Sequence, residues 1–349
     1  MALANALPKN QTTRSHRQAM SIDADRLAGL ARTKLESLVR RAFPDVAADA
    51  VGFNAGVGLV DGDRAFVLLI KRAPSPLAAA LAWGEQHGAT ELHVVVDDPD
   101  PMLALEARGL APQPRLWHAV GTELVAMSDP GLESVGEAPS TVLAQIPTLE
   151  AAGCEAVIEH GVVIGEVLGL EVARVAVEAD GAAIVRVGVG LYDQEAHALV
   201  HAHSPVDERL RDVSAEVRRH RNADAGPHPL NRVARERWLR SIVCADPGLL
   251  QLDSCVVEAP IVARGGIHEQ RPVAARGTRG SRNVLVVCSS GIDLDLVPTA
   301  AAHLAHGGLA QADEVLLVLP QRDHHAVVER MLVHLAVDAS LVAIADPWP

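Results

Sequence analysis

The chain has 349 residues, which is enough for two or three domains that each bury a core, and its 49% hydrophobic and 21% charged residues are typical of a globular protein. The net charge of −13 excludes a protein whose whole surface binds nucleic acid or an anionic membrane, so bulk nucleic-acid binding is disfavoured. Aromatic residues make up only 2% of the chain, so the core must be built from Ala, Val, Leu and Ile.

The first 20 residues are polar and lack the apolar run of a signal peptide, which predicts a disordered tail. No apolar run in the chain reaches the ~18 residues of a membrane span, so no membrane association is expected. The four cysteines form no Cys-x-x-Cys pair, which favours reduced thiols and a cytoplasmic protein.

The segment 21–128 is predicted to form an N-terminal α/β domain. Ser21 can cap a helix that runs to Arg41, and Asp61-Gly62-Asp63 between two Val-rich runs is a hairpin signal. The expected elements are strands at 51–60 and 64–71, a helix at 76–87, a strand at 91–96, a helix at 102–108 and a strand at 115–120.

The α-β-β-α-β layout of residues 24–96 resembles the restriction-endonuclease-like family, which carries an acid on one hairpin strand and an acid-x-Lys motif on the next. Lys71 ends the second hairpin strand, but Leu69 stands where the family has its acid. The resemblance implies a degenerate nuclease fold used for binding or scaffolding. The segments 169–174 and 288–295 also resemble stretches of uncharacterised actinobacterial proteins, which implies no activity.

Residues 129–148 contain three prolines and are predicted to be a linker. The second domain, 149–349, is expected to begin with a helix at 149–160, strands at 170–177 and 183–190, and helices at 206–221 and from about 229 to 243. Residues 246–282 are rich in Gly and Pro and are expected to be irregular. Because each half begins with a helix and a hairpin, the two halves could be related repeats.

The last part of the chain alternates short apolar runs with helical segments. Strands are expected at 283–288, 314–319 and 340–344, with helices at 298–306 and 324–335 between them. This alternation predicts consecutive parallel strands with crossover helices. The fold class is therefore α/β, with two similar-sized α/β units.

Three groups of polar residues are candidate sites. In parallel sheets, ligands bind beyond the carboxyl ends of the strands, and here those ends carry acids and histidines. The candidate catalytic residues here are Asp293, Asp295 and Asp323, and the candidate metal ligands are Asp293, Asp295, His324 and His325, while Asp346 follows the last strand. The acids suit Mg²⁺ or Mn²⁺ and the histidines suit a transition metal. The alternative is that the aspartates are helix caps and turn residues.

The second group consists of Glu159, Glu166, Glu171, Arg174, Asp193 and Glu195. Glu171 and Arg174 interrupt an otherwise apolar strand, so a buried pair, catalytic or structural, is one interpretation. A solvent-facing strand edge guarded by charge is the other.

The third group is an arginine-rich stretch at 206–240, with its sharpest positive cluster at Arg218, Arg219 and Arg221. Guanidinium groups bind phosphate and carboxylate in a bidentate manner, so this stretch could hold an anionic ligand together with His228 and Asn231. A solvated helix face and a helix-capping Asn231 are the alternatives.

No nucleotide-binding loop follows any predicted strand, and the acid-x-Lys motif is missing. The favoured hypothesis is a non-enzymatic or degenerate nuclease-like protein that binds a protein partner or an anionic ligand. The alternative is a metal-assisted hydrolase or nuclease that uses the C-terminal Asp and His loops. Self-association as a homo-oligomer is left open.

Overall fold

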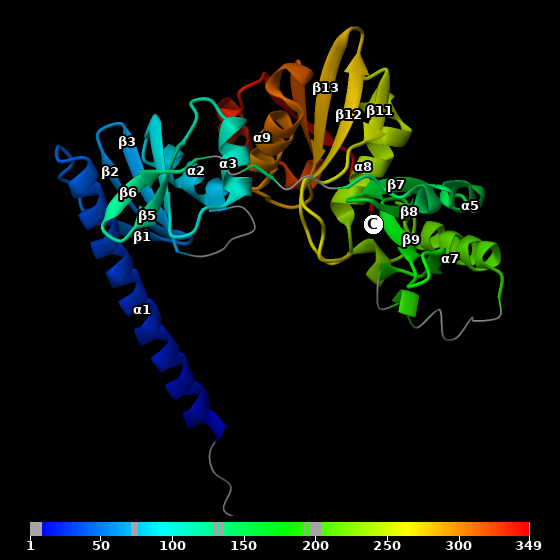
Figure 1. Ribbon diagram of the computed structural model, residues 1–349, viewed down its shortest axis with the longest axis horizontal. Coiled ribbons are helices and arrows are strands. Elements are labelled where there is room, and N and C mark those ends of the chain that lie inside the picture. Colours follow the sequence, from blue (N-terminus) through cyan, green and yellow to red (C-terminus); the bar gives the residue numbers. More distant parts are fainter. Residues whose placement is uncertain are drawn as a thin grey trace, which may run out of the picture. The chain divides into compact units, whose positions relative to one another are not determined.

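The computed structural model describes residues 9–70, 76–128, 131–132, 136–190, 193–195 and 204–348, the first 17 of these by their backbone alone. The chain divides into two compact units, one formed by 1–100 with 114–128 and the other by 101–113 with 129–349 (Figure 1). Among the described residues, no helix is both long enough and apolar enough to cross a bilayer. Lys71 lies outside the described residues.

A six-stranded mixed sheet forms the first unit, with its strands in chain order. Its elements are α1 (Lys9–Ala42), β1 (Val51–Phe53), β2 (Gly56–Asp61), β3 (Arg64–Leu69), α2 (Pro76–Gln86), β4 (Glu91–Val96), β5 (Arg115–Val120) and β6 (Glu123–Ala126). Strands β1 to β3 pair antiparallel, β3 to β5 pair parallel, and β6 returns antiparallel. Leu35, Leu38 and Val39 of α1 pack against Leu59 and Phe66 of the sheet.

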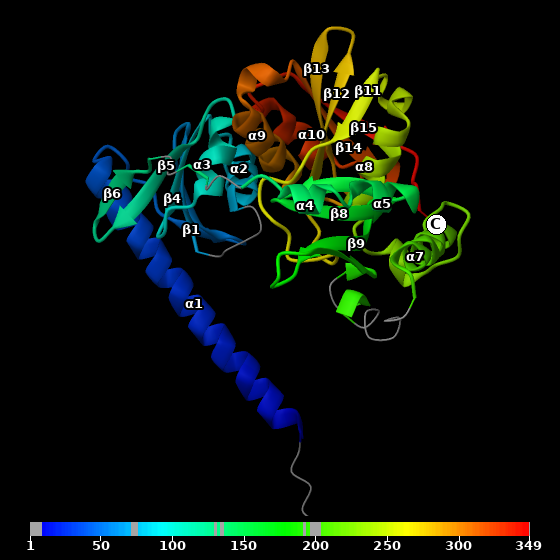
Figure 2. The same ribbon diagram turned by 45° about the vertical axis from the view of Figure 1, so that its right-hand side comes forward.

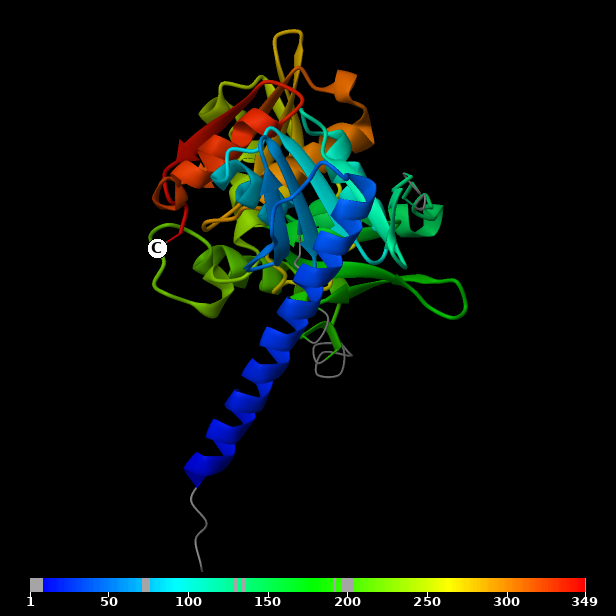
Figure 3. The same cartoon turned by 90° about the vertical axis from the view of Figure 1, so that its left-hand side faces the viewer.

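Helix α1 is longer than the sequence predicted. It begins at Lys9 rather than after Ser21, so residues 9–20 of the expected tail are helical, and its N-terminal part extends beyond the sheet that its C-terminal part covers (Figure 3). The strand expected at 51–60 is in fact two strands, because a tight turn between Phe53 and Gly56 folds β1 back onto β2.

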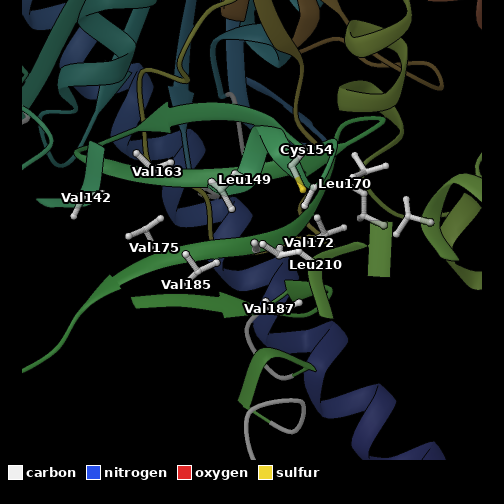
Figure 4. Packing of buried hydrophobic residues seen from close by; sticks show 14 of the residues in the cluster. Val142, Leu149, Cys154, Val163, Leu170, Val172, Val175, Val185, Val187 and Leu210 are labelled. Carbon is white, nitrogen blue, oxygen red and sulfur yellow. The ribbon is translucent and has the colours of Figure 1, made fainter. Parts of the chain in front are cut away.

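The second unit contains a four-stranded antiparallel sheet. Its strands are β7 (Glu155–Glu159), β8 (Val162–Val167), β9 (Leu170–Val177) and β10 (Ala183–Val187), packed with α4 (Ser140–Leu143), α5 (Ile146–Ala151) and α7 (Val206–His220). Leu149 of α5, Leu210 of α7 and valines of β8 to β10 gather in one apolar core (Figure 4).

This sheet corrects two predictions. The helix expected at 149–160 ends at Ala151, because Gly153 adopts a left-handed turn (φ 81°) and the chain leaves it as β7. The expected linker at 129–148 contains α4 and the start of α5. The strands and the turn expected between residues 170 and 187 are present as β9 and β10.

A five-stranded mixed sheet completes the second unit (Figure 2). Its elements are α8 (Arg235–Ala245), β11 (Ser254–Val257), β12 (Val273–Arg279), β13 (Arg282–Cys288), α9 (Leu296–Gly307), β14 (Glu314–Pro320), α10 (Ala326–Met331) and β15 (Ala339–Ile344). Strands β13, β14 and β15 are consecutive and parallel, which confirms the predicted α/β arrangement. Strands β11 and β12, which extend the sheet antiparallel, lie in the stretch expected to be irregular.

The order helix, three strands, helix, strand, helix, strand occurs twice in the chain. It runs from α1 to β5, with α3 (Pro101–Arg108) as its third helix, and again from α8 to β15. In both copies the first three strands pair antiparallel and the last three pair parallel. The sequence suggested a second repeat that begins at residue 149, whereas the repeated layout begins at α8, and the four-stranded sheet lies between the two copies in sequence.

Candidate active site in the second unit

The loops after β13 and β14 meet, as parallel strands require. The backbone N–H of Gly291 donates to Asp323 over 2.7 Å. Asp293 accepts the hydroxyl of Ser289 over 2.6 Å and the backbone N–H of Asp295 over 2.9 Å, so its carboxylate shapes its own loop. Burial raises the pKa of Asp293. Asp346, after β15, pairs with Arg322 at 3.0 Å.

These loops do not assemble the expected metal site. His324 pairs with Glu329 at 3.0 Å, and the ring of His325 accepts the backbone N–H of Val327, which caps α10. Within the part of the chain that the structure describes, no three His, Cys, Asp or Glu side chains are grouped so that they could hold a metal ion. Asp293 stabilises its own turn and His325 caps a helix, whereas Asp323 links the loops that follow β13 and β14.

The arginines at the end of α7 point to different partners rather than to a shared ligand. Arg218 donates to the carbonyl of Gly153, and Arg219 pairs with Glu216 within the helix. Arg221 is buried, donates to the carbonyls of Val233 and Ala234, and lies 4.6 Å from the ring of Trp238. Burial lowers the pKa of Arg221 to about 9. The anion site predicted at Arg218, Arg219 and Arg221 is therefore not formed.

The two other residues predicted for that site also have local roles. His228 accepts the N–H of Leu230 and stacks on His220 with ring centroids 3.7 Å apart. Asn231 is buried and donates to the carbonyl of Gly226. Both residues shape the turn between α7 and α8.

A buried ionic network joins the four-stranded sheet to α8. The Arg237 guanidinium donates to both oxygens of Glu159, at 2.7 and 2.9 Å, and to Glu166. Arg240, one helical turn on, donates to the other oxygen of Glu166 at 3.0 Å. Glu166 and Arg240 are each only 1% exposed. Burial alone would raise the pKa of Glu166, but Arg237 and Arg240 outweigh it and hold that pKa below its usual range.

The register of the sheet explains why this network needs several cations. Glu166 on β8 lies directly opposite Glu171 on β9, next to a bulge at Gly165. Two like charges at a cross-strand position repel unless cations lie between them. Arg174 binds Glu171 through two hydrogen bonds of 2.9 Å, and the amide of Gln194 donates to it at 3.0 Å. The pair Glu171–Arg174 is therefore formed, with Glu171 buried and Arg174 half-buried, and Glu159, Glu166 and Glu171 do not face solvent.

Next to this network lies a cavity of about 280 Å³. Its polar lining residues are Glu159, His160, Glu171, Arg174, Arg237 and Arg264. Its apolar lining residues are Val162, Ile164, Ala234, Ala263 and Ile267, together with Gly169 and Gly266. The lining thus combines charged and aliphatic side chains, as small-molecule sites do.

Arg264 differs from the other arginines of this lining because no carboxylate of a described residue is bound to it. It comes from the loop between β11 and β12, and no ion pair or hydrogen bond is formed by its side chain among the residues that the structure describes. Burial, together with the nearby charges of Arg237 and Arg240, lowers the pKa of Arg264 to about 9, so the group stays charged at neutral pH. Glu269 holds this loop, because it accepts the N–H of Gly265 and pairs with Arg271.

Two more donor atoms at the cavity lack partners. The Nε2 atom of His160 and the Nε atom of Arg237 are buried and form no hydrogen bond with any described residue. His160 occupies the left-handed region (φ 50°) at the turn from β7 to β8, so the turn itself places its ring at the cavity. Buried polar atoms without partners are rare in native proteins, and here two of them lie at one cavity, together with the unpaired Arg264.

The sequence pointed to part of this site. Its acids and Arg174 belong to the second candidate group, whereas Asp193 lies outside the network and accepts the N–H of Val189. His160 and Arg264 were not anticipated. The sequence marks Arg264 only by its place directly after the apolar run Ile261-Val262-Ala263. The glycines and prolines of that segment predicted an irregular loop.

The chain matches no protein-family model, no curated protein and no solved structure.

Proposed function

We propose that the second unit binds a small anionic molecule in the cavity beside Arg237 and Arg264. The observation that carries this proposal is the unpaired guanidinium of Arg264. A cation partly removed from water destabilises the folded protein unless negative charge compensates it. The acids whose charges act on Arg264, Glu159 and Glu166, are already bound by Arg237 and Arg240, and no described residue forms an ion pair with Arg264, so a further negative charge is needed. A bound anion would supply it and would accept the hydrogen bonds that His160 and Arg237 leave unused.

The arrangement favours binding over hydrolysis. Both carboxylates of the lining are already bound to an arginine, Glu159 by Arg237 and Glu171 by Arg174, so each serves as a counter-ion within the protein. The proposal agrees with the non-enzymatic anion-binding hypothesis drawn from the sequence, and it moves the site from the arginines of α7 to the loop before β12.

The test compares anion binding by the wild-type protein with binding by Arg264→Gln. Isothermal titration with phosphate, sulfate, acetate and butyrate should detect at least one anion that binds the wild type. Loss of the charged hydrogen bonds should weaken that binding about 10- to 100-fold in the variant. Arg186→Gln is the control, because Arg186 lies on β10 and pairs with Glu178 away from the cavity. If no anion binds, or if both variants bind as the wild type does, the proposal is wrong.

A further inference from the structure

The charge of the cavity limits which anion it can accept. Three arginines line it, Arg174, Arg237 and Arg264, against two glutamates, Glu159 and Glu171. Behind the wall, Glu166 and Arg240 pair with each other and add no net charge. The lining therefore carries one positive charge in excess, and that charge is at Arg264.

A ligand with a single negative charge would bring this balance to zero. A dianion would leave an uncompensated negative charge beside the buried carboxylates of Glu159 and Glu171, where repulsion is screened less than in bulk water. The guanidinium of Arg264 is a planar fork that fits the two oxygens of a carboxylate. In its neutral form, His160 can donate one further hydrogen bond from Nε2.

The aliphatic residues of the lining determine which chemical groups the rest of the ligand can carry. Val162, Ile164 and Ile267 offer aliphatic surface and no polar side-chain atoms. At ~30 Å³ for each water-sized group, a cavity of about 280 Å³ holds about nine groups, which is the size of benzoate or of a medium-length fatty acid. A fully hydrated ion such as phosphate would leave these aliphatic side chains in contact with water.

We infer that the cavity binds a monocarboxylate with a small apolar body, its carboxylate at Arg264 and its body against Val162, Ile164 and Ile267. This inference rests on the proposed function, because it names the class of anion for the same site. The apolar body would contribute affinity in proportion to the aliphatic surface that it buries.

The experiment measures affinities of the full-length wild-type protein for two matched series by isothermal titration. In the first, acetate, butyrate and isovalerate should bind with affinities that rise about fourfold for each added CH₂ group. In the second, isovalerate is compared with isovaleramide, which has the same shape without the charge, and with succinate and inorganic phosphate. Isovalerate should bind at least about tenfold more tightly than each of these.

Two variants locate the ligand. Arg264→Gln should lose the preference for isovalerate over isovaleramide, and Val162→Thr, which keeps the shape of the side chain, should weaken isovalerate more than acetate. Circular dichroism shows whether each variant is folded. Arg264→Lys is a further test, because lysine retains the positive charge but not the planar fork of the guanidinium. This variant should bind isovalerate with an affinity between those of the wild type and Arg264→Gln.

The outcomes separate this inference from the proposed function. Phosphate or succinate binding more tightly than isovalerate would overturn the monocarboxylate and leave anion binding intact. Equal binding of acetate and isovalerate would overturn the apolar body alone. Binding of isovaleramide as tight as that of isovalerate, or no binding by any anion, would overturn both.

Discussion

Arg237 shows how a single side chain connects two layers of the second unit. Its guanidinium, on α8, binds Glu159 at the end of β7 and Glu166 on β8. Burial would lower the pKa of Arg237, but the two glutamates outweigh it and raise that pKa. A network of this kind adds little to stability when it is complete, but it becomes costly when one partner is removed.

Replacing Arg237 by Met should therefore destabilise the protein strongly. The change leaves Glu159 and Glu166 without their main cation, and we expect the free energy of unfolding to fall by about 3–5 kcal/mol. Urea denaturation followed by circular dichroism measures this. Arg219→Met is the control, because the exposed Arg219–Glu216 pair should contribute less than about 1 kcal/mol. Similar losses in both variants would contradict the role assigned to Arg237.

The buried Glu236 should make the folded protein less stable as the pH rises, whereas an acid that is paired with a cation makes it more stable. Burial raises its pKa, the charge of Asp293 adds to this, and the hydroxyl of Ser290, which donates to it at 2.7 Å, only partly offsets it. A carboxyl group whose folded-state pKa is raised loses stability as the pH increases from its unfolded pKa, ~4.3, through its folded pKa.

The neutral variant Glu236→Gln should therefore be more stable than the wild type at pH 7.5 and equally stable near pH 4. Thermal unfolding at a series of pH values measures the difference. Glu150→Gln, on the exposed side of α5, should show no such trend. A difference between Glu236→Gln and the wild type that is constant with pH would refute the raised pKa.

At the level of elements, the turn between β8 and β9 brings a backbone unusually close to α8. Gly169 adopts a left-handed conformation (φ 71°), and a Cβ atom placed on it would lie 2.2 Å from the carbonyl carbon of Arg237. Only glycine allows both the conformation and the approach. The turn thus helps to set the distance between the sheet and the arginines at the cavity.

Gly169→Ala and Gly181→Ala form a matched pair that isolates this approach. Gly181, in the β9–β10 turn, has a similar conformation (φ 85°), but a Cβ there would meet nothing within 4 Å. Gly181→Ala should cost about 1–2 kcal/mol for the backbone conformation alone. Gly169→Ala should cost about 1–3 kcal/mol more, because the helix must move away. Equal losses in chemical denaturation would show that the approach carries no energy.

Some elements could be predicted from the sequence because a local signal specified them. The hairpin at Asp61-Gly62-Asp63 and the parallel strands β13 to β15 have turn residues or uninterrupted apolar runs. Strand β7 was mistaken for a helix because Ala and Glu favour helices, and only its pairing with β8 makes it a strand. In β12, Gly277 suggested a break, whereas in the sheet it makes room for Leu252 and the carbonyl of Ser254.

The candidate site was harder to predict for the same reason. Glu171 and Arg174 are close in sequence, so their pairing was foreseen, whereas Arg237 and Arg264 reach the cavity from α8 and from the loop before β12. No local pattern reports such long-range contacts. The predicted Asp and His cluster failed because its residues are used by the turns and helix caps that contain them.

On the scale of the whole molecule, many charged side chains of the described residues bind other groups of the protein. Of the arginines between 206 and 240, Arg211 and Arg219 pair within α7, while Arg221, Arg237 and Arg240 are buried. With a net charge of −13, we expect no affinity for polyanions. Fluorescence anisotropy with labelled single-stranded DNA at ~50 mM salt, where phosphate contacts are strongest, should show no binding. Salt-sensitive binding under these conditions would contradict this expectation.

The order of the strands has a consequence for how the chain is made. In all three sheets of the described structure, every strand pairs with the strand next to it in sequence. A nascent chain leaving the ribosome therefore supplies the partner of each strand as the next strand, and closing a hairpin turn such as that of β2 and β3 costs little entropy. The antiparallel sheet β7 to β10 needs only its own turns, whereas β13 to β15 must wait for the helices α9 and α10 that connect them. We expect synthesis to proceed with little exposed strand edge at any time, and thus with a low risk of misassembly between chains.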